Sequence, residues 1–131
     1  MNNYKNGTNW EIELKHIFKL NNLVVLNLGF NEIGDLVVFD GKPRVIECKV
    51  VHNNNKFYLS RNPKQSKRLY ELYSKGISVY YAVKFIINHK SYIRFFIIKE
   101  KNNPLVLTID NGYSLTEFLE HVKKDIKNKS D

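Results

Sequence analysis

Three acidic residues and one lysine in the first half of the chain have the types and spacing needed to hold a divalent metal ion beside a phosphate. They are Glu11, Asp35, Glu47 and Lys49. Asp35 and Glu47 lie in otherwise apolar runs, where a charge is costly unless it is paired or bound to a metal ion. Carboxylate oxygens, completed by water and the backbone carbonyl of Cys48, are the ligands that Mg²⁺ or Mn²⁺ prefers. Such an ion lowers the pKa of a bound water, while Lys49 would orient the nucleophile or stabilise a pentavalent transition state.

The spacing of Glu47 and Lys49 indicates that they share one face of a strand. Alternate side chains of a strand point the same way, which separates these two by about 7 Å at a rise of ~3.3 Å per residue. The opposite face then takes Arg44, Ile46, Cys48 and Val50. If residues 36–39 pair with this strand through the Asp40-Gly41 turn, Asp35 and Glu47 converge. Taken alone, the same residues also fit an ion pair on a solvated strand, with Asp35 as a turn residue.

Apolar periodicity and turn residues predict the elements that must position these side chains. A helix is predicted over about 8–21, capped by Thr8 or Asn9, because Trp10, Leu14, Ile17 and Phe18 recur at helical spacing. Strands are predicted at 23–28, 36–39, 44–51, 77–87, 92–98 and 105–109, with a loop at 53–55. Pro63 begins and Gly76 ends a second helix, and a third is predicted over 114–126 before a frayed tail. The order indicates a mixed α/β (α+β) domain with helices flanking a central sheet.

Composition predicts a single compact domain in a reducing compartment. The chain of 131 residues suffices for one core, and no segment reaches the ~20 apolar residues of a membrane span. The N-terminus lacks the apolar run of a secretory signal, so we expect the cytoplasm. The single cysteine, Cys48, excludes an intramolecular disulfide and a cysteine-based zinc cluster, and it is expected to be a small core residue. The four histidines show no metal-ligand spacing and are expected at the surface.

The charge balance indicates a polyanionic partner. Lys and Arg number 21 against 13 Asp and Glu, a net charge of +8 that favours nucleic acid, although an AT-rich genome would also enrich Lys and Asn. Basic residues gather after the strand at 44–51, namely Lys56, Arg61, Lys64, Lys67 and Arg68. They suit contacts with DNA phosphates or, alternatively, form a solvated helix face.

Three segments occur in an order that resembles a known nuclease superfamily. They are Gly7-Thr8-Asn9-Trp10-Glu11, Gly34-Asp35-Leu36-Val37 and Val45-Ile46-Glu47-Cys48-Lys49. Their succession is similar to the PD-(D/E)xK pattern of archaeal and phage Holliday junction resolvases. Residues 56–69, 81–85 and 93–96 extend the likeness, which spans about residues 4–99. The C-terminal thirty residues, with a helical extension at about 113–127, have no counterpart in the shorter archaeal members.

The resemblance implies a restriction-endonuclease-like central mixed β-sheet and a homodimer that cuts branched DNA with Mg²⁺, for which Mn²⁺ substitutes. By position it implies metal ligands or water-positioning carboxylates at Glu11, Asp35 and Glu47, a catalytic lysine at Lys49 and an auxiliary polar group at Gln65. Glu11 is preferred to Glu13 only by this resemblance, because both border the apolar stripe of the helix. Archaeal resolvases carry arginines where this chain has Ile12 and Leu26 or Asn27, and a hydrophobic residue or proline where it has Gly34.

Other functions also fit the sequence. The chain could be a related nuclease acting on flaps, single strands or a short duplex sequence, or a non-catalytic nucleic-acid-binding module of the same fold. It could also be a structural protein with a chance Glu-x-Lys triplet. Eight aromatic residues read mainly as core, with a dimer contact or base stacking as the alternative: Tyr70, Tyr73, Tyr80, Tyr81, Phe85, Tyr92, Phe95 and Phe96.

Overall fold

A five-stranded mixed sheet forms the centre of the computed structural model, which describes residues 2–28, 35–59, 62–98 and 106–130. Its strand order is β1-β2-β3-β5-β6. The strands are β1 (Val24–Asn27), β2 (Leu36–Phe39), β3 (Pro43–His52), β5 (Ser78–Ile87) and β6 (Lys90–Ile97). β3 and β5 pair in parallel, whereas the other neighbours are antiparallel. The predicted central mixed sheet is therefore confirmed.

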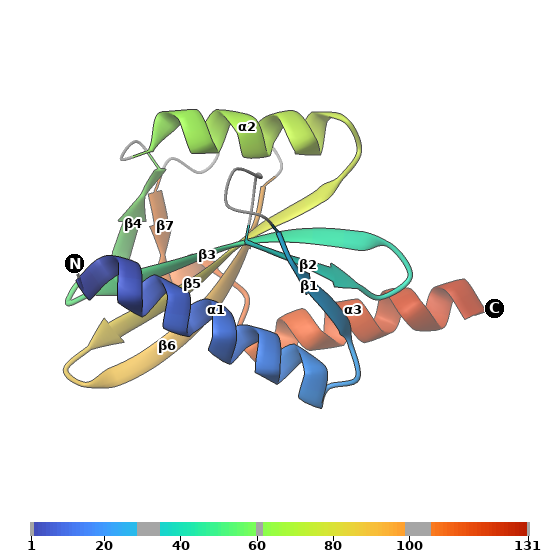
Figure 1. The fold of residues 1–131 in the computed structure, drawn as a ribbon, viewed down its shortest axis with the longest axis horizontal. Coiled ribbons are helices and arrows are strands. Elements are labelled where there is room, and N and C mark those ends of the chain that lie inside the picture. The colour runs from blue at the N-terminus through green and yellow to red at the C-terminus, as the bar shows by residue number, and fades with distance from the viewer. Residues whose placement is uncertain (1, 29–34, 60–61, 99–105, 131) are drawn as a thin grey trace.

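Helices cover both faces of the sheet (Figure 1). α1 (Asn2–Leu20) and α3 (Leu115–Ser130) lie on one face, and α2 (Pro63–Ser74) lies on the other. Alternation along β5 divides the core accordingly. Tyr80 and Ala82 pack with the apolar residues of α1 and α3, whereas Tyr81 and Val83 pack with Leu69 of α2. None of the described helices has the length and apolar content needed to cross a membrane.

The hairpin that joins β2 to β3 has the predicted turn at Asp40-Gly41. Gly41 adopts a φ of 109°, a conformation that residues with a Cβ rarely take. The register pairs Leu36 with Ile46. Asp40 forms an ion pair with Arg44, and both side chains are buried.

The structure differs from the sequence prediction at both ends of the chain and after β3. α1 begins at Asn2, so Thr8 and Asn9 lie inside the helix and do not cap it. Residues 2–8 contain no proline, and one interior glycine costs a helix only about 1 kcal/mol. The closing helix continues to Ser130, through the predicted tail.

A small second sheet was not fully anticipated. β4 (Lys56–Tyr58) pairs antiparallel with β7 (Val106–Thr108), which the 3₁₀ turn η2 (Ile109–Asn111) follows. β4 was not predicted, because a three-residue strand is too short to display alternation. Phe57 turns inward, with its ring centroid 5.8 Å from that of Tyr81.

Candidate active site

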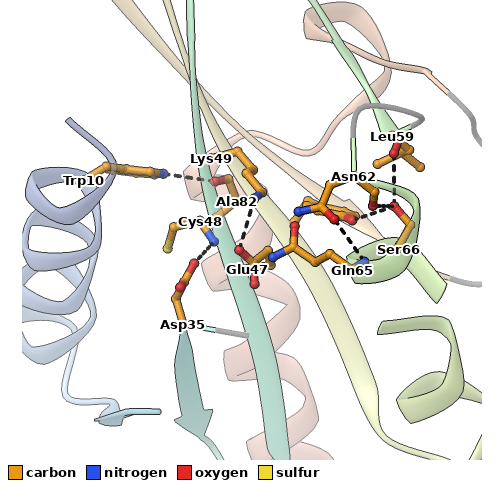
Figure 2. A network of polar contacts seen from close by, with 11 residues as sticks. Trp10, Asp35, Glu47, Cys48, Lys49, Leu59, Asn62, Gln65, Ser66 and Ala82 are labelled. Atoms are coloured by element: carbon orange, nitrogen blue, oxygen red, sulfur yellow. Dashed lines mark hydrogen bonds and ion pairs between the residues drawn. The ribbon is translucent and has the colours of Figure 1, made fainter. Parts of the chain in front are cut away.

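Asp35 occupies the edge of β3 at the point where pairing with β2 ends. Its backbone N–H donates to the carbonyl of Ile46 at 2.9 Å. One of its carboxylate oxygens accepts the backbone N–H of Cys48 at 2.7 Å (Figure 2). The carboxylate thus accepts a backbone N–H of β3 that a backbone carbonyl would have accepted if β2 began earlier in the chain. This holds the carboxylate beside β3, just beyond the last residue pair that joins β2 to β3.

Glu11 and Glu47 approach Asp35 from different elements. Glu11 lies on α1, on the face that also holds Cys48, and Glu47 lies on the face that α2 covers. Asp35 lies near both glutamates and raises the pKa of each. Three carboxyl groups therefore gather beside β3, where its pairing with β2 ends. The hairpin predicted from Asp40-Gly41 produces the convergence of Asp35 and Glu47.

Lys49 accompanies Glu47 on the same face of β3, as the strand period predicts. Its Nζ lies 3.4 Å from Oε2 of Glu47. The residue Glu47 is only 4% exposed, so a plain ion pair on a solvated strand does not describe this arrangement. Glu47 is buried, it pairs with Lys49, and two further carboxyl groups lie nearby. Such a cluster is stabilised by additional positive charge or by protonation of its carboxyl groups.

The electrostatics of the cluster reflect this crowding. Burial first, and then the nearby, negatively charged Asp35, raise the pKa of Glu11 to about 7. Burial and then the charge of Asp35 raise the pKa of Glu47 to about 8, and Lys49 opposes this rise. Burial and the three carboxylates also raise the pKa of the Cys48 thiol well above its ordinary value. Strongly shifted acids at one place are a mark of functional sites.

Glu13, the alternative helix carboxylate, is engaged elsewhere. Its Oε1 lies 2.7 Å from Nζ of Lys84 on β5. The same ammonium group stands 5.5 Å from the centroid of the Trp10 ring. Glu11 is therefore the helix carboxylate that lies beside Asp35.

Trp10 anchors the turn of α1 that carries Glu11. Its indole N–H donates to the carbonyl of Ala82 on β5 at 3.0 Å, and the whole side chain is buried (Figure 2). From the sequence, Trp10 was identified only as a core residue. The available signal was chemical, because a buried indole N–H needs an acceptor.

Gln65 belongs to the first turn of α2, which faces the site. Pro63 begins the helix, and the side-chain oxygen of Asn62 accepts the backbone N–H of Gln65 at 3.2 Å. Figure 2 shows the side chain of Gln65 extending from α2 toward Glu47. The cap thus fixes the start of the helix that brings this amide to the site.

The basic residues predicted to contact DNA lie on β4 and α2. Lys56, Lys64, Lys67 and Arg68 are exposed, and in the described part of the chain none of them forms an ion pair. Arg61 lies outside the described residues. All four histidines are exposed, as expected. Five of the eight aromatic residues are buried core: Tyr80, Tyr81, Phe85, Phe95 and Phe96.

The donor set is compatible with Mg²⁺, although no closed cage is present. Among the described residues, no group of three or more His, Cys, Asp or Glu side chains is arranged as a preformed metal site. Asp35 lies near both Glu11 and Glu47, whose pKa values it raises. Mg²⁺ usually binds one or two carboxylates directly and keeps water or substrate phosphate in its other positions. Carboxylates that leave part of the ion open to water fit that preference, and a third carboxylate can then position a bound water.

Comparison with known proteins identifies the fold. No protein-family model matches the sequence, and no curated protein matches it. Among solved structures, the chain is similar to Hjc of Archaeoglobus fulgidus, a Holliday junction resolvase from an archaeal hyperthermophile. The TM-score is 0.64 at 19% identity, over 88% of this chain and 96% of that one. The resemblance to archaeal resolvases is therefore confirmed at the level of the fold.

The C-terminal segment takes part in this likeness. Residues 1–99 are too few to make up 88% of the 131 residues, so the matched span extends past residue 99. Phe118 and Val122 of α3 pack with the residues of α1 and the central strands, so the closing helix is part of the core.

Proposed function

We propose that this protein is a metal-dependent DNA endonuclease that cuts four-way junctions. The observation that carries the proposal is the position of Asp35, whose carboxylate is held against Cys48 of β3 and whose charge raises the pKa of Glu11 on α1 and of Glu47 on β3. The fold shared with a Holliday junction resolvase supports the same class of activity.

The proposed ligands of Mg²⁺, or of Mn²⁺ in its place, are the carboxylates of Glu11, Asp35 and Glu47 and the backbone carbonyl of Cys48. The N–H and C=O of one strand residue face the same neighbouring strand. The Cys48 carbonyl therefore faces the edge where its N–H meets Asp35. When bound, such an ion lowers the pKa of a coordinated water and neutralises charge on a phosphate.

Two further side chains have proposed roles beside these ligands. Lys49, held 3.4 Å from Glu47, would orient the attacking water or stabilise the pentavalent transition state. Gln65, whose side chain extends toward Glu47, would serve as an auxiliary polar group.

DNA binding is assigned to the exposed cations next to the site. Lys56, Lys64, Lys67 and Arg68, together with Arg61, would contact backbone phosphates, and the net charge of +8 would draw DNA to the protein. Resolution of a junction needs two symmetric incisions. A homodimer with one site in each subunit would supply them.

A panel of labelled substrates tests this function. The wild type and Glu47→Ala are incubated with a four-way junction, a flap, a single strand and a linear duplex, with Mg²⁺ or with EDTA. We expect paired incisions in the junction by the wild type, only with Mg²⁺, and none by Glu47→Ala. Equal cutting of the flap or linear duplex would replace the resolvase by another nuclease of this fold. Binding without cutting would indicate a non-catalytic module. A wild type that neither binds nor cuts any of these substrates would contradict the proposal.

A further inference from the structure

Tyr81 is the register partner of Glu47 across the parallel pair of β3 and β5. Partners in a parallel pair point to the same face of the sheet, so both side chains lie beneath α2. The residue Tyr81 is 2% exposed, and its ring packs against Phe57 of β4. It therefore lies next to the proposed catalytic carboxylate without being open to substrate.

The hydroxyl group of Tyr81 reaches the first turn of α2. Its oxygen lies 3.3 Å from Oγ of Ser66. That serine hydroxyl donates to the carbonyls of Asn62, at 3.2 Å, and Leu59, at 3.3 Å (Figure 2). The two hydroxyl groups are therefore within hydrogen-bond distance of each other, and either one can be the donor. Three segments thus meet at one point: the end of β4, the start of α2, and β5 beside Glu47.

The segment held in this way carries Gln65, whose side chain extends toward Glu47. The exposed Lys64 and Lys67 lie on either side of Gln65 and Ser66 in the sequence. Any movement of this first turn relative to β3 would displace Gln65 from Glu47. A hydrogen bond between the hydroxyl of the buried Tyr81 and that of the half-buried Ser66 limits such movement, because breaking it leaves the Tyr81 hydroxyl without this partner in a buried position.

We propose that Tyr81 and Ser66 form a positioning pair that fixes the first turn of α2 against the strand carrying Glu47. The pair would thereby align a phosphate held by α2 with the metal-binding carboxylates. This inference rests on the proposed nuclease function for its effect on catalysis. The pair itself is a property of the free protein.

Three matched variants test the positioning pair. Tyr81→Phe removes one hydroxyl and keeps the ring against Phe57. Ser66→Ala removes the other hydroxyl. Tyr80→Phe is the control, because Tyr80 is the neighbouring buried tyrosine on the opposite face of β5.

Cleavage of bound DNA in a single turnover, with Mg²⁺, is the first readout. We expect Tyr81→Phe to lower the rate about tenfold or more, because small displacements in a site slow the chemical step strongly. Its Kd for junction DNA in EDTA should change less than about twofold, since the phosphate-binding side chains on α2 remain exposed. The double variant with Ser66→Ala should be no slower than Ser66→Ala alone, because Ser66→Ala already removes the contact that Tyr81→Phe breaks. Tyr80→Phe should cleave at the wild-type rate.

Amide hydrogen exchange of the free protein is the second readout and needs no activity. Backbone amides in the first turn of α2 should exchange faster in Tyr81→Phe and Ser66→Ala than in Tyr80→Phe. Unchanged exchange in both variants would overturn the positioning pair. A Tyr81→Phe variant that cleaves at the wild-type rate, or loses affinity and rate in equal proportion, would also overturn it. If the wild type cleaves no DNA, the proposed function fails, and the exchange result alone supports or overturns the pair.

Discussion

The carboxylate of Asp35 and the backbone N–H of Cys48 form a 2.7 Å hydrogen bond at the edge of β3. This contact lies where the pairing of β2 with β3 ends and where the cluster of carboxyl groups is found. α1 brings Glu11 to it from one face of the sheet, and β3 brings Glu47 on the other face. The arrangement needs all three elements to meet at one edge, so a single residue, Asp35, connects the two faces.

Replacement of Asp35 by asparagine separates the hydrogen bond from the charge. The amide oxygen of Asn can still accept the N–H of Cys48, so the fold should persist. Loss of one negative charge relieves repulsion with Glu11 and Glu47, and the metal-free variant should unfold at the same temperature as the wild type or higher. Cleavage with Mg²⁺ should fall about 100-fold or more, since one proposed ligand becomes neutral. Thermal unfolding in EDTA measures the stability, and a cleavage assay measures the activity. A strongly destabilised Asp35→Asn variant would refute this account of Asp35.

Glu11 and Glu13 offer a matched pair on one helix. Glu11→Gln should reduce cleavage about 100-fold, because Glu11 lies against Asp35. Glu13→Gln should leave cleavage near the wild-type level, because Glu13 pairs with Lys84 on β5. Single-turnover cleavage rates of the two variants show which glutamate is the helix carboxylate of the site. Equal losses, or the reverse order, would show that the helix carboxylate has been wrongly assigned.

The raised acids predict a definite pH dependence. Glu11 and Glu47 have pKa values of about 7 and about 8, above the ordinary 4.5. Between the ordinary and the raised values, the metal-free native state binds more protons than the unfolded chain, so the free energy of unfolding falls as pH rises. This stabilisation is complete below the ordinary pKa and is lost as pH passes through about 8.

Metal binding should reverse this trend, because the ion needs deprotonated carboxylates. Mg²⁺ should therefore raise the unfolding temperature more at high pH than at low pH, and cleavage should increase with pH through the raised pKa values. Unfolding curves recorded over this pH range, in EDTA and in Mg²⁺, measure both effects. A metal-free protein that becomes more stable as pH rises across the window would contradict the carboxyl cluster.

The exposed cations of α2 should govern the salt dependence of DNA binding. Lys64→Ala, Lys67→Ala or Arg68→Ala should each weaken binding and lower the slope of log K against log salt by about 1. Lys123→Ala provides the control, because Lys123 is exposed on α3 across the sheet. Binding titrations at several salt concentrations give the slopes. If all four variants lower the slope alike, the attraction is diffuse and α2 is not the DNA surface.

Part of the site follows from local sequence pattern. The two-residue period of a strand places Glu47 and Lys49 on one face, and the Asp40-Gly41 turn brings Asp35 to the neighbouring edge. Both inferences use only residues close together in the chain. The same reasoning located the central strands, because they are rich in β-branched, aromatic and other apolar residues and most are bounded by turn residues.

The remainder depends on contacts between distant segments. Glu11 is distinguished from Glu13 by how α1 docks on β5, through the hydrogen bond of Trp10 to Ala82 and the ion pair with Lys84. Neither contact can be predicted from the pattern of neighbouring residues in the sequence. The positioning of α2 likewise depends on a hydroxyl pair fifteen residues apart, between Ser66 and Tyr81.

Titration of the protein with Mn²⁺ by calorimetry tests the central claim most directly, because it needs neither a DNA substrate nor a choice of cleavage assay. The wild type should bind the ion at the Asp35 edge, with protons released in the neutral range as the raised carboxyl groups ionise. Glu47→Ala, which removes one proposed ligand, should bind it much more weakly. A wild type that binds no divalent ion, or a Glu47→Ala variant that binds it equally well, would contradict the claim.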